Sequence, residues 1–156
     1  MSYANAVIAT PGVTYTYDPN YLRPASMTDG TGTTLYSYHP ILATPTLGAN
    51  QLASVDGPLP NDTITYAYDE LGRRVSTAIN GVASRMTYDA AGRVISETNA
   101  LGVFTMAYDG STGRVLTNTL PNGQIEERSY GDNLQDRTLQ RITHRVGATQ
   151  IGRAHV

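Results

Sequence analysis

A short phrase that returns at a fixed interval constrains the fold of this chain more than any other feature. The phrase is Tyr-x-Tyr-Asp-x-x-Gly-Arg, and its clearest copy runs from Tyr66 to Arg73. Its second tyrosine, Tyr68, is followed by Tyr88 and Tyr108, so these three copies stand 20 residues apart. Such a period is typical of repeat proteins, in which each unit buries its apolar face against its neighbours. The sequence therefore predicts an array of like units.

Each unit has the pattern of a β-hairpin. Tyr66 and Tyr68 alternate with smaller residues, which places both rings on one face of a strand. Asp69 and Gly72 then supply turn chemistry, because aspartate accepts hydrogen bonds from a turn backbone and glycine tolerates positive φ. A second strand follows over residues 73–79, and the Asn-Gly pair after it suits a two-residue turn into the next hairpin. The predicted fold class is all-β, an array of antiparallel β-hairpins.

The repeat also predicts contacts between and within units. We expect Arg73 to pair with Asp69 and Arg93 with Asp89, each across its own turn, and stacked units to place tyrosine beside tyrosine in a ladder. The third copy has one extra residue, which we expect in a loop or bulge. His39 replaces the aspartate of an earlier copy, and Arg128 to Tyr130 forms a degenerate later one. The predicted structural motif positions are Tyr15, Tyr17, Asp18, Tyr36, Tyr38, Tyr66, Tyr68, Asp69, Gly72, Arg73, Tyr88, Asp89, Gly92, Arg93, Tyr108, Asp109, Gly113 and Arg114.

The period divides the chain into segments. Residues 1–38 hold N-terminal copies of the phrase, and residues 64–130 hold the regular hairpin array. Residues 39–63 are rich in proline and break the period, so an irregular connection is predicted there. Residues 131–150 are predicted to be a degenerate repeat or a loop, and Leu134 to Ile142 is the one candidate for a helix.

The last six residues, 151–156, match the translation of a widely used short-read sequencing adapter. We therefore expect them to be adapter read-through at the end of an interrupted reading frame. The alternative is a genuine polar C-terminus, and the nucleotide sequence distinguishes the two. For this reason His155 is left out of the functional reasoning.

Composition argues against several classes of function. The chain has 11 tyrosines but no cysteine, which excludes disulfides and thiolate metal sites. Its net charge is −2 and its arginines are scattered, so it lacks the basic stripe of a nucleic-acid-binding surface. No apolar run approaches the roughly 18 residues that a membrane-spanning helix needs. We expect neither nucleic-acid binding nor membrane insertion.

The residue types of catalysis occur without a catalytic arrangement. His39 and His144 are far apart and occupy different positions of the repeat. Glu126 and Glu127 are adjacent on a predicted strand and point to opposite faces, which argues against a pair of carboxylates acting together. The motif aspartates and arginines recur at the repeat period, which favours turn architecture over a metal or acid–base site. We expect no catalytic residue, no metal and no cofactor.

The repeated phrase resembles that of the RHS/YD-repeat family. The strongest matches are residues 66–73, 88–93 and 108–114, and looser similarity extends over residues 13–130. This family includes bacterial Rhs polymorphic toxins, the B and C components of insecticidal toxin complexes, wall-associated proteins and the animal teneurins. The resemblance implies hairpins that wind into a spiral sheet and close into a hollow shell. In toxin members the shell holds a C-terminal toxic domain. No Asp-Pro-x-Gly-Leu-like self-cleavage segment occurs here, so neither cleavage nor toxicity is assigned to any residue.

The resemblance implies a non-enzymatic structural segment of a secreted or bacterial cell-surface shell. Its partners would be the remainder of the same polypeptide and the enclosed C-terminal domain. The alternative is a cell-surface carbohydrate-binding or adhesion module, in which rows of tyrosine rings contact sugar. An exposed tyrosine face favours the binding module, whereas tyrosines packed against neighbouring hairpins favour the scaffold.

Overall fold

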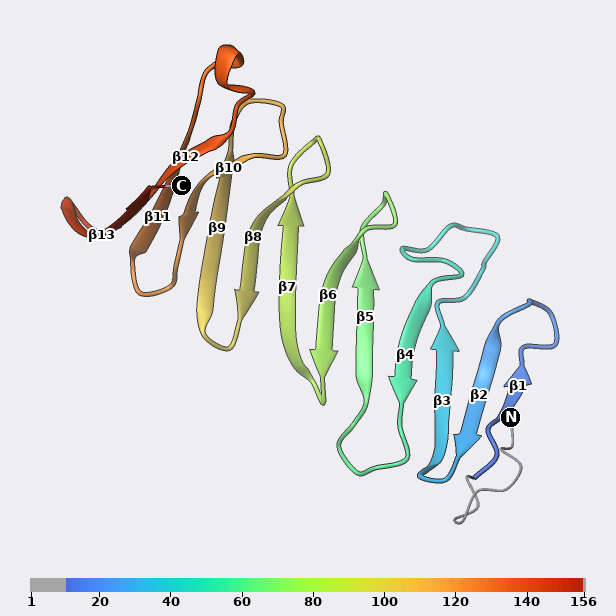
Figure 1. Cartoon of the computed structure of the whole chain (residues 1–156). Helices are drawn as coiled ribbons and strands as arrows, with labels where there is room; N and C mark the ends of the chain where they lie inside the picture. The colour runs from blue at the N-terminus through green and yellow to red at the C-terminus, as the bar shows by residue number, and fades with distance from the viewer. Residues whose placement is uncertain (1–10, 156) are drawn as a thin grey trace, which may run out of the picture. The chain divides into compact units, whose positions relative to one another are not determined.

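Antiparallel β-strands make up most of this protein, as the hairpin pattern predicts. A computed structural model describes residues 11–155. The chain divides into two compact units, residues 1–83 and 84–156, and each is described by itself. Within each unit the strands lie side by side in the order in which they occur in the chain (Figure 1).

The first unit is a meander of six strands. These are β1 (Thr14–Tyr17), β2 (Pro24–Asp29), β3 (Gly32–Tyr38), β4 (Leu52–Asp56), β5 (Ile64–Tyr68) and β6 (Arg74–Ile79). Each strand pairs antiparallel with the next one along the chain. β1 is the first of the described strands and pairs with β2 alone among them.

The second unit has the same pattern and begins within β7, whose first two residues belong to the first unit. Its strands are β7 (Val82–Tyr88), β8 (Val94–Asn99), β9 (Gly102–Tyr108), β10 (Val115–Thr119), β11 (Gln124–Tyr130), β12 (Leu139–Val146) and β13 (Thr149–His155). A single turn of 3₁₀ helix, η1 (Asn133–Gln135), lies between β11 and β12. No helix in the described part of the chain is long and apolar enough to cross a membrane.

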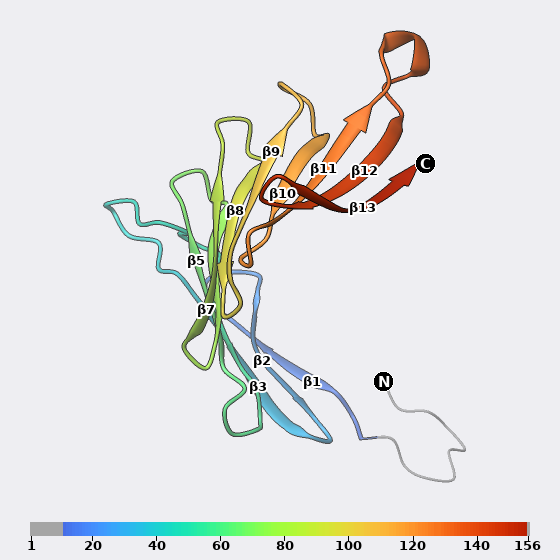
Figure 2. The same ribbon diagram turned by 90° about the vertical axis from the view of Figure 1, so that its left-hand side faces the viewer.

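The described part of each unit is one layer thick, so within residues 11–155 neither unit has an enclosed core. The view in Figure 2 shows strands without a second sheet packed over them. Among the described residues, the one apolar side chain classed as buried is Ala78, at 9% exposure, and the one polar side chain is Thr143, at 7%. Most domains bury a core between two layers. Here, cross-strand neighbours within the sheet provide the cover instead.

The two faces of the sheet differ in side-chain size. On β9, Phe104, Met106 and Tyr108 are half-buried, while Val103 and Thr105 on the opposite face are exposed. β3 and β5 alternate in the same way, with their motif tyrosines on the half-buried face. Large side chains cover one another along one face because alternate residues of every strand point to it.

The prediction of an irregular connection over residues 39–63 is wrong for its second part. β4 (Leu52–Asp56) is a regular strand that pairs with both β3 and β5. The irregular parts are residues 39–51, before β4, and residues 57–63, after it. All the prolines of residues 39–63 lie outside β4. They therefore leave the backbone N–H groups of this strand free to form ladder hydrogen bonds, which a proline within the strand would prevent.

The helix candidate at Leu134 to Ile142 is also wrong. Only the short η1 forms there, and β12 begins at Leu139. Residues 151–155, which match the adapter translation, belong to β13, and this strand pairs antiparallel with β12. Such pairing depends little on side-chain identity, so it does not test the origin of these residues. Residues 1–10 and Val156 lie outside the described residues.

The turn between β8 and β9 has no room for a side chain at Gly102. Gly102 has φ of +125°, and a Cβ added to it would lie 2.6 Å from the Pro121 Cβ. We expect Gly102→Ala to lower the free energy of unfolding by about 1–3 kcal/mol. Urea unfolding followed by tyrosine fluorescence measures this loss.

Gly113→Ala is the matched control for Gly102→Ala. Gly113 has an ordinary φ, and no atom lies within 4 Å of a Cβ added there. Its replacement is expected to change stability by less than about 0.5 kcal/mol. Equal losses in the two variants would contradict the steric explanation.

Candidate functional site

The repeated turn is held together by backbone and side-chain hydrogen bonds. In the turn after β5, the Asp69 N–H donates to the Arg73 carbonyl at 2.9 Å and closes the loop. One carboxylate oxygen of Asp69 accepts from the backbone N–H groups of Leu71 (3.0 Å) and Arg73 (2.8 Å). Gly72 completes the reversal with φ of +74°. The turn after β7 repeats this geometry, with Asp89, Ala91, Gly92 and Arg93 in the same places.

The predicted pairing of aspartate with arginine within each turn is present. The Nε of Arg73 lies 2.7 Å from Asp69 Oδ2, and Arg93 makes the same contact with Asp89. Burial pulls the pKa of Asp69 upward, but the Arg73 backbone and guanidinium outweigh it and hold the pKa below its ordinary value. The Arg93 backbone N–H, followed by its side chain, lowers the pKa of Asp89.

These lowered pKa values predict an acid limit to stability. A carboxyl group with a lower pKa in the folded state stabilises that state above its unfolded pKa, and this contribution is lost as the pH falls. The ordinary value is 3.8, so we expect the urea midpoint to fall as the pH is lowered from 5 to 2. Unfolding curves of the wild type and of the Asp69→Asn, Asp89→Asn double variant check this. A wild-type midpoint as flat as that of the double variant would contradict it.

Arginine also joins each turn to the next hairpin. The Arg93 guanidinium lies 4.5 Å from the centre of the Tyr108 ring, a cation–π distance. One of its terminal nitrogens donates to the Gly110 carbonyl at 2.8 Å and also to the Thr112 carbonyl. Arg93 therefore links the turn after β7 with the turn after β9.

The second motif tyrosine joins the same network through its hydroxyl. The Tyr108 hydroxyl donates to the Val94 carbonyl at 2.6 Å, and Val94 directly follows Arg93. Equivalent bonds join Tyr38 to Pro24, Tyr68 to Leu52 and Tyr130 to Val115, at 2.8–2.9 Å. A β-bulge next to these tyrosines shifts the register and re-aims the side chain.

The prediction of a tyrosine–tyrosine ladder is therefore corrected. Tyr108 and Tyr130 lie on β9 and β11, with β10 between them. Two strand spacings separate equivalent positions by about 9.5 Å, which is too far for direct packing of the rings. The arginine of the preceding turn fills this gap, as Arg114 does at 5.7 Å from the Tyr130 ring centre.

In the turn of the third copy, a different glycine has the positive φ. Asp109 pairs with Arg114 at 2.9 Å, as the aspartates of the two preceding copies pair with their arginines. The positive φ, however, is at Gly110 (+52°), while the predicted motif residue Gly113 has ordinary geometry. The extra residue lies in this turn, as predicted. It lets the chain reverse earlier, which removes the need for a left-handed glycine before the arginine.

The break in the period is an enlarged turn of the same kind. The His39 N–H donates to the Gln51 carbonyl at 2.9 Å, which is the closing bond that Asp69 and Arg73 make elsewhere. Gln51 takes the arginine position and donates to the Gly72 carbonyl at 3.1 Å. The His39 ring meets Tyr68 edge-on, with centroids 5.6 Å apart. The predicted motif therefore missed Gln51, which no local signal in the sequence marks.

The first copy has an arginine that the predicted motif also missed. Arg23 pairs with Asp18 at 2.8 Å and lies 4.1 Å from the centre of the Tyr38 ring. A signal was present, since Arg23 follows Asp18 by the same five residues that separate Asp109 from Arg114.

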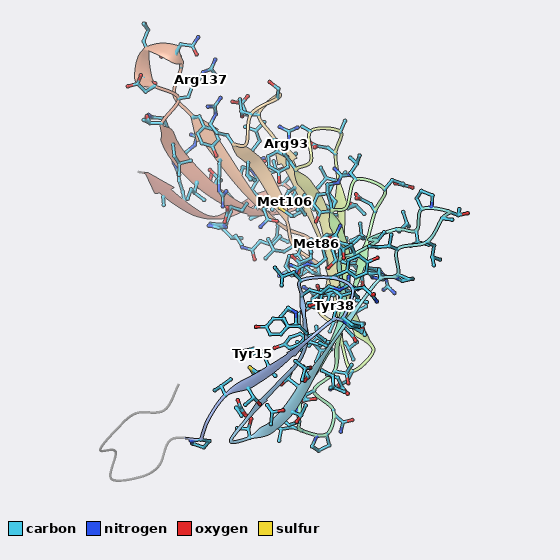
Figure 3. The ribbon with its side chains drawn as sticks, turned by 90° about the vertical axis from the view of Figure 1, so that its right-hand side faces the viewer. Tyr15, Tyr38, Met86, Arg93, Met106 and Arg137 are labelled. Carbon is cyan, nitrogen blue, oxygen red and sulfur yellow. The ribbon has the colours of Figure 1, made fainter. Side chains whose placement is uncertain are left out.

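The first motif tyrosine has a simpler role than the second. Tyr36 and Tyr66 are half-buried on their strands, and Met86 and Met106 occupy the equivalent positions in two later copies (Figure 3). A methionine has no hydroxyl, so the position requires apolar bulk alone. Tyr15 is the equivalent residue on β1 and is 50% exposed.

The titratable residues considered for catalysis are not brought together. Glu126 pairs with Arg128 at 2.5 Å, whereas Glu127 pairs with Arg145 of β12. His39 belongs to the first unit and His144 to the second. Within residues 11–155, no group of three or more histidine or acidic side chains is placed to hold a metal. A cleft of about 490 Å³ lies between the enlarged turn and residues 69–72, lined in part by Pro45, Leu47 and Leu71.

Comparison with known proteins supports a repeat architecture. The family model named RHS Repeat matches residues 88–125. A search of curated protein sequences gave no match. A chain in the crystal structure of TcdB2-TccC3-TEV is similar in fold, with a TM-score of 0.66 and 17% identity. That alignment covers 97% of this chain and 9% of the other, so this chain spans a small part of its length.

A chain in the crystal structure of TcdB2-TccC3 also matches, with a TM-score of 0.30 and 16% identity over 94% of this chain and 11% of that chain. A similarity this low carries no argument. The match to TcdB2-TccC3-TEV concerns the fold alone, and the sequence match locates the repeat at residues 88–125.

Proposed function

We propose that this chain, which is an RHS/YD-repeat segment, forms part of the wall of a larger β-shell that encloses a cargo. The observation that carries the proposal is the linkage of successive turns through Arg93, which contacts its own turn, the Tyr108 ring and the carbonyls of the following turn. A single-layer sheet has little core to hold it in shape. Such linkages between hairpins supply the stiffness that a wall requires.

The proposed role is structural and non-enzymatic. The polar motif residues are engaged with one another in turn geometry, as Asp69 is with Arg73. The hydroxyls of Tyr38, Tyr68, Tyr108 and Tyr130 are bonded to backbone carbonyls, which supports a scaffold over a sugar-binding row of rings. The partners in this proposal are the rest of the same polypeptide shell and its enclosed C-terminal domain, in a secreted or cell-surface protein.

Limited proteolysis of the full-length protein tests the enclosure. We expect the enclosed domain to resist protease in the wild type and to become cleavable when Arg73, Arg93 and Arg114 are all replaced by alanine. The control is Arg85→Ala, since Arg85 is exposed on the opposite side of β7 from Met86. Rapid cleavage of the wild-type domain under native conditions would overturn the proposal.

A further inference from the structure

A small polar pocket lies in the second unit, on the face of the sheet opposite the motif tyrosines. It has a volume of about 200 Å³ and is lined by residues of β10, β11 and β12. Residues directly opposite one another in a register point to the same side of a sheet. Thr117 lies opposite Glu127, Glu127 opposite Thr143, and Ser129 opposite Arg141, so these five lining residues share one face.

This face is covered more closely at the pocket than at the strand before it. On β9 the same face is exposed at Val103, Thr105 and Ala107. On β11 all seven residues are half-buried, and Thr143 of β12 is only 7% exposed. Thr143 is therefore a covered polar side chain that borders a hollow in the sheet.

Three hydroxyl groups of the pocket are available to a ligand. The hydroxyls of Thr117, Ser129 and Thr143 make no hydrogen bond with any of residues 11–155, and all three residues line the pocket. In the first unit, by contrast, the Ser37 and Ser54 hydroxyls bond to each other across two strands at 2.7 Å. Thr117 and Thr143 cannot do the same, because a whole strand lies between them.

The pocket also carries an uncompensated positive charge. Two arginines beside it are paired with glutamates, Arg128 with Glu126 and Arg145 with Glu127. Arg141 lines the pocket and forms no ion pair in the described part of the chain. Arg153 lies opposite Thr143 on β13 but does not line the pocket, so the pocket does not depend on it.

We propose that this pocket binds a tetrahedral oxyanion, a phosphate or sulfate group, between the Arg141 guanidinium and the three hydroxyls. Hydrogen bonds from a guanidinium to an anion are charge-assisted and are among the strong ones in proteins. A tetrahedral oxyanion has enough oxygens to accept from donors on all three strands, whereas a carboxylate has two. The volume suits a small ion, because pockets for drug-sized ligands are larger, at about 300–1,000 Å³. The proposed anion site does not rest on the enclosure of a cargo.

NMR titration of the full chain tests the site. Amide ¹H–¹⁵N spectra are recorded at neutral pH and constant ionic strength while chloride is replaced by inorganic phosphate. We expect saturable shifts at the amide signals of β10, β11 and β12, with a Kd in the millimolar range. Arg141→Gln is expected to weaken binding about tenfold, because a charge-assisted contact is lost, and Thr143→Val about fivefold, because one hydroxyl is lost.

Two controls separate binding from folding and from net charge. Valine keeps the shape of threonine, so Thr143→Val is expected to change the free energy of unfolding in chloride by less than about 0.5 kcal/mol. Arg85→Gln removes the same charge from an exposed position of β7 that does not line the pocket. This variant is expected to bind phosphate like the wild type.

Other anions identify the group that is recognised. Sulfate is expected to bind like phosphate, and acetate more weakly. Methyl phosphate that binds like inorganic phosphate would support an ester on a larger molecule as the source. Binding of inorganic phosphate without methyl phosphate would support the free ion.

Three results contradict the inference. These are the absence of saturable shifts in the wild type, equal phosphate affinity of Arg141→Gln and the wild type, and acetate binding as tight as that of phosphate. None of them bears on enclosure, because proteolysis of the full-length protein measures that separately.

Discussion

Arg93→Ala is expected to destabilise the second unit by about 2 kcal/mol. The substitution removes the ion pair with Asp89, the contact with the Tyr108 ring and the bond to the Gly110 carbonyl. The Arg93 side chain is 22% exposed, so solvent weakens these interactions only in part. Urea unfolding followed by tyrosine fluorescence measures the loss.

Two further variants identify the cause of that loss. Arg93→Lys keeps the charge but lacks the planar fork, so it should recover less than half of the lost stability. Arg85→Ala removes an exposed arginine of β7 and is expected to cost less than about 0.5 kcal/mol. If Arg85→Ala and Arg93→Ala cost the same, net charge rather than the linkage between turns would explain the effect.

Tyr108→Ala is expected to cost about 3 kcal/mol, the largest effect of the substitutions considered. The ring is half-buried on β9 and covered by Arg93, and its hydroxyl holds the Val94 carbonyl. Tyr108→Phe keeps the ring and loses only the hydroxyl hydrogen bond, so this variant is expected to lower the free energy of unfolding by about 1 kcal/mol. The same urea measurement resolves the two contributions.

Tyr66→Phe is the control for the hydroxyl effect at Tyr108. Tyr66 occupies the first motif position, where methionine stands in two other copies. Its hydroxyl is expected to contribute less than about 0.5 kcal/mol. A loss at Tyr66→Phe equal to that at Tyr108→Phe would show that the two positions of the phrase are not distinct.

The hairpins and the aspartate–arginine turns follow from the sequence because their causes are local. Asp69, Gly72 and Arg73 lie within five residues, and the chemistry of each fixes its place in the turn. The alternation of large and small residues before the turn likewise fixes which face each side chain occupies. The turns at residues 69–73 and 89–93 follow these rules, with positive φ at Gly72 and Gly92.

The contacts between hairpins were predicted wrongly, as a ladder of tyrosines, because the true contacts join residues that only the folded sheet brings together. The Arg93 and Tyr108 side chains are 15 residues apart, and the β-bulge that aims the tyrosine depends on the pairing of its strand. Gln51 was missed for a related reason. The turn that Gln51 closes is enlarged by several residues, so Gln51 does not stand at the motif spacing from His39 that would identify it in the sequence.

Pairing of each strand with the next one along the chain has a consequence for synthesis. Every hairpin can form as soon as its second strand leaves the ribosome, because none of the described pairings waits for a distant partner. Folding should then proceed in step with translation, and a stalled ribosome would carry a nascent chain whose exposed hairpins are already native. Arrest of translation after β6, followed by pulse proteolysis of the nascent chain, would show protected hairpins before the second unit exists.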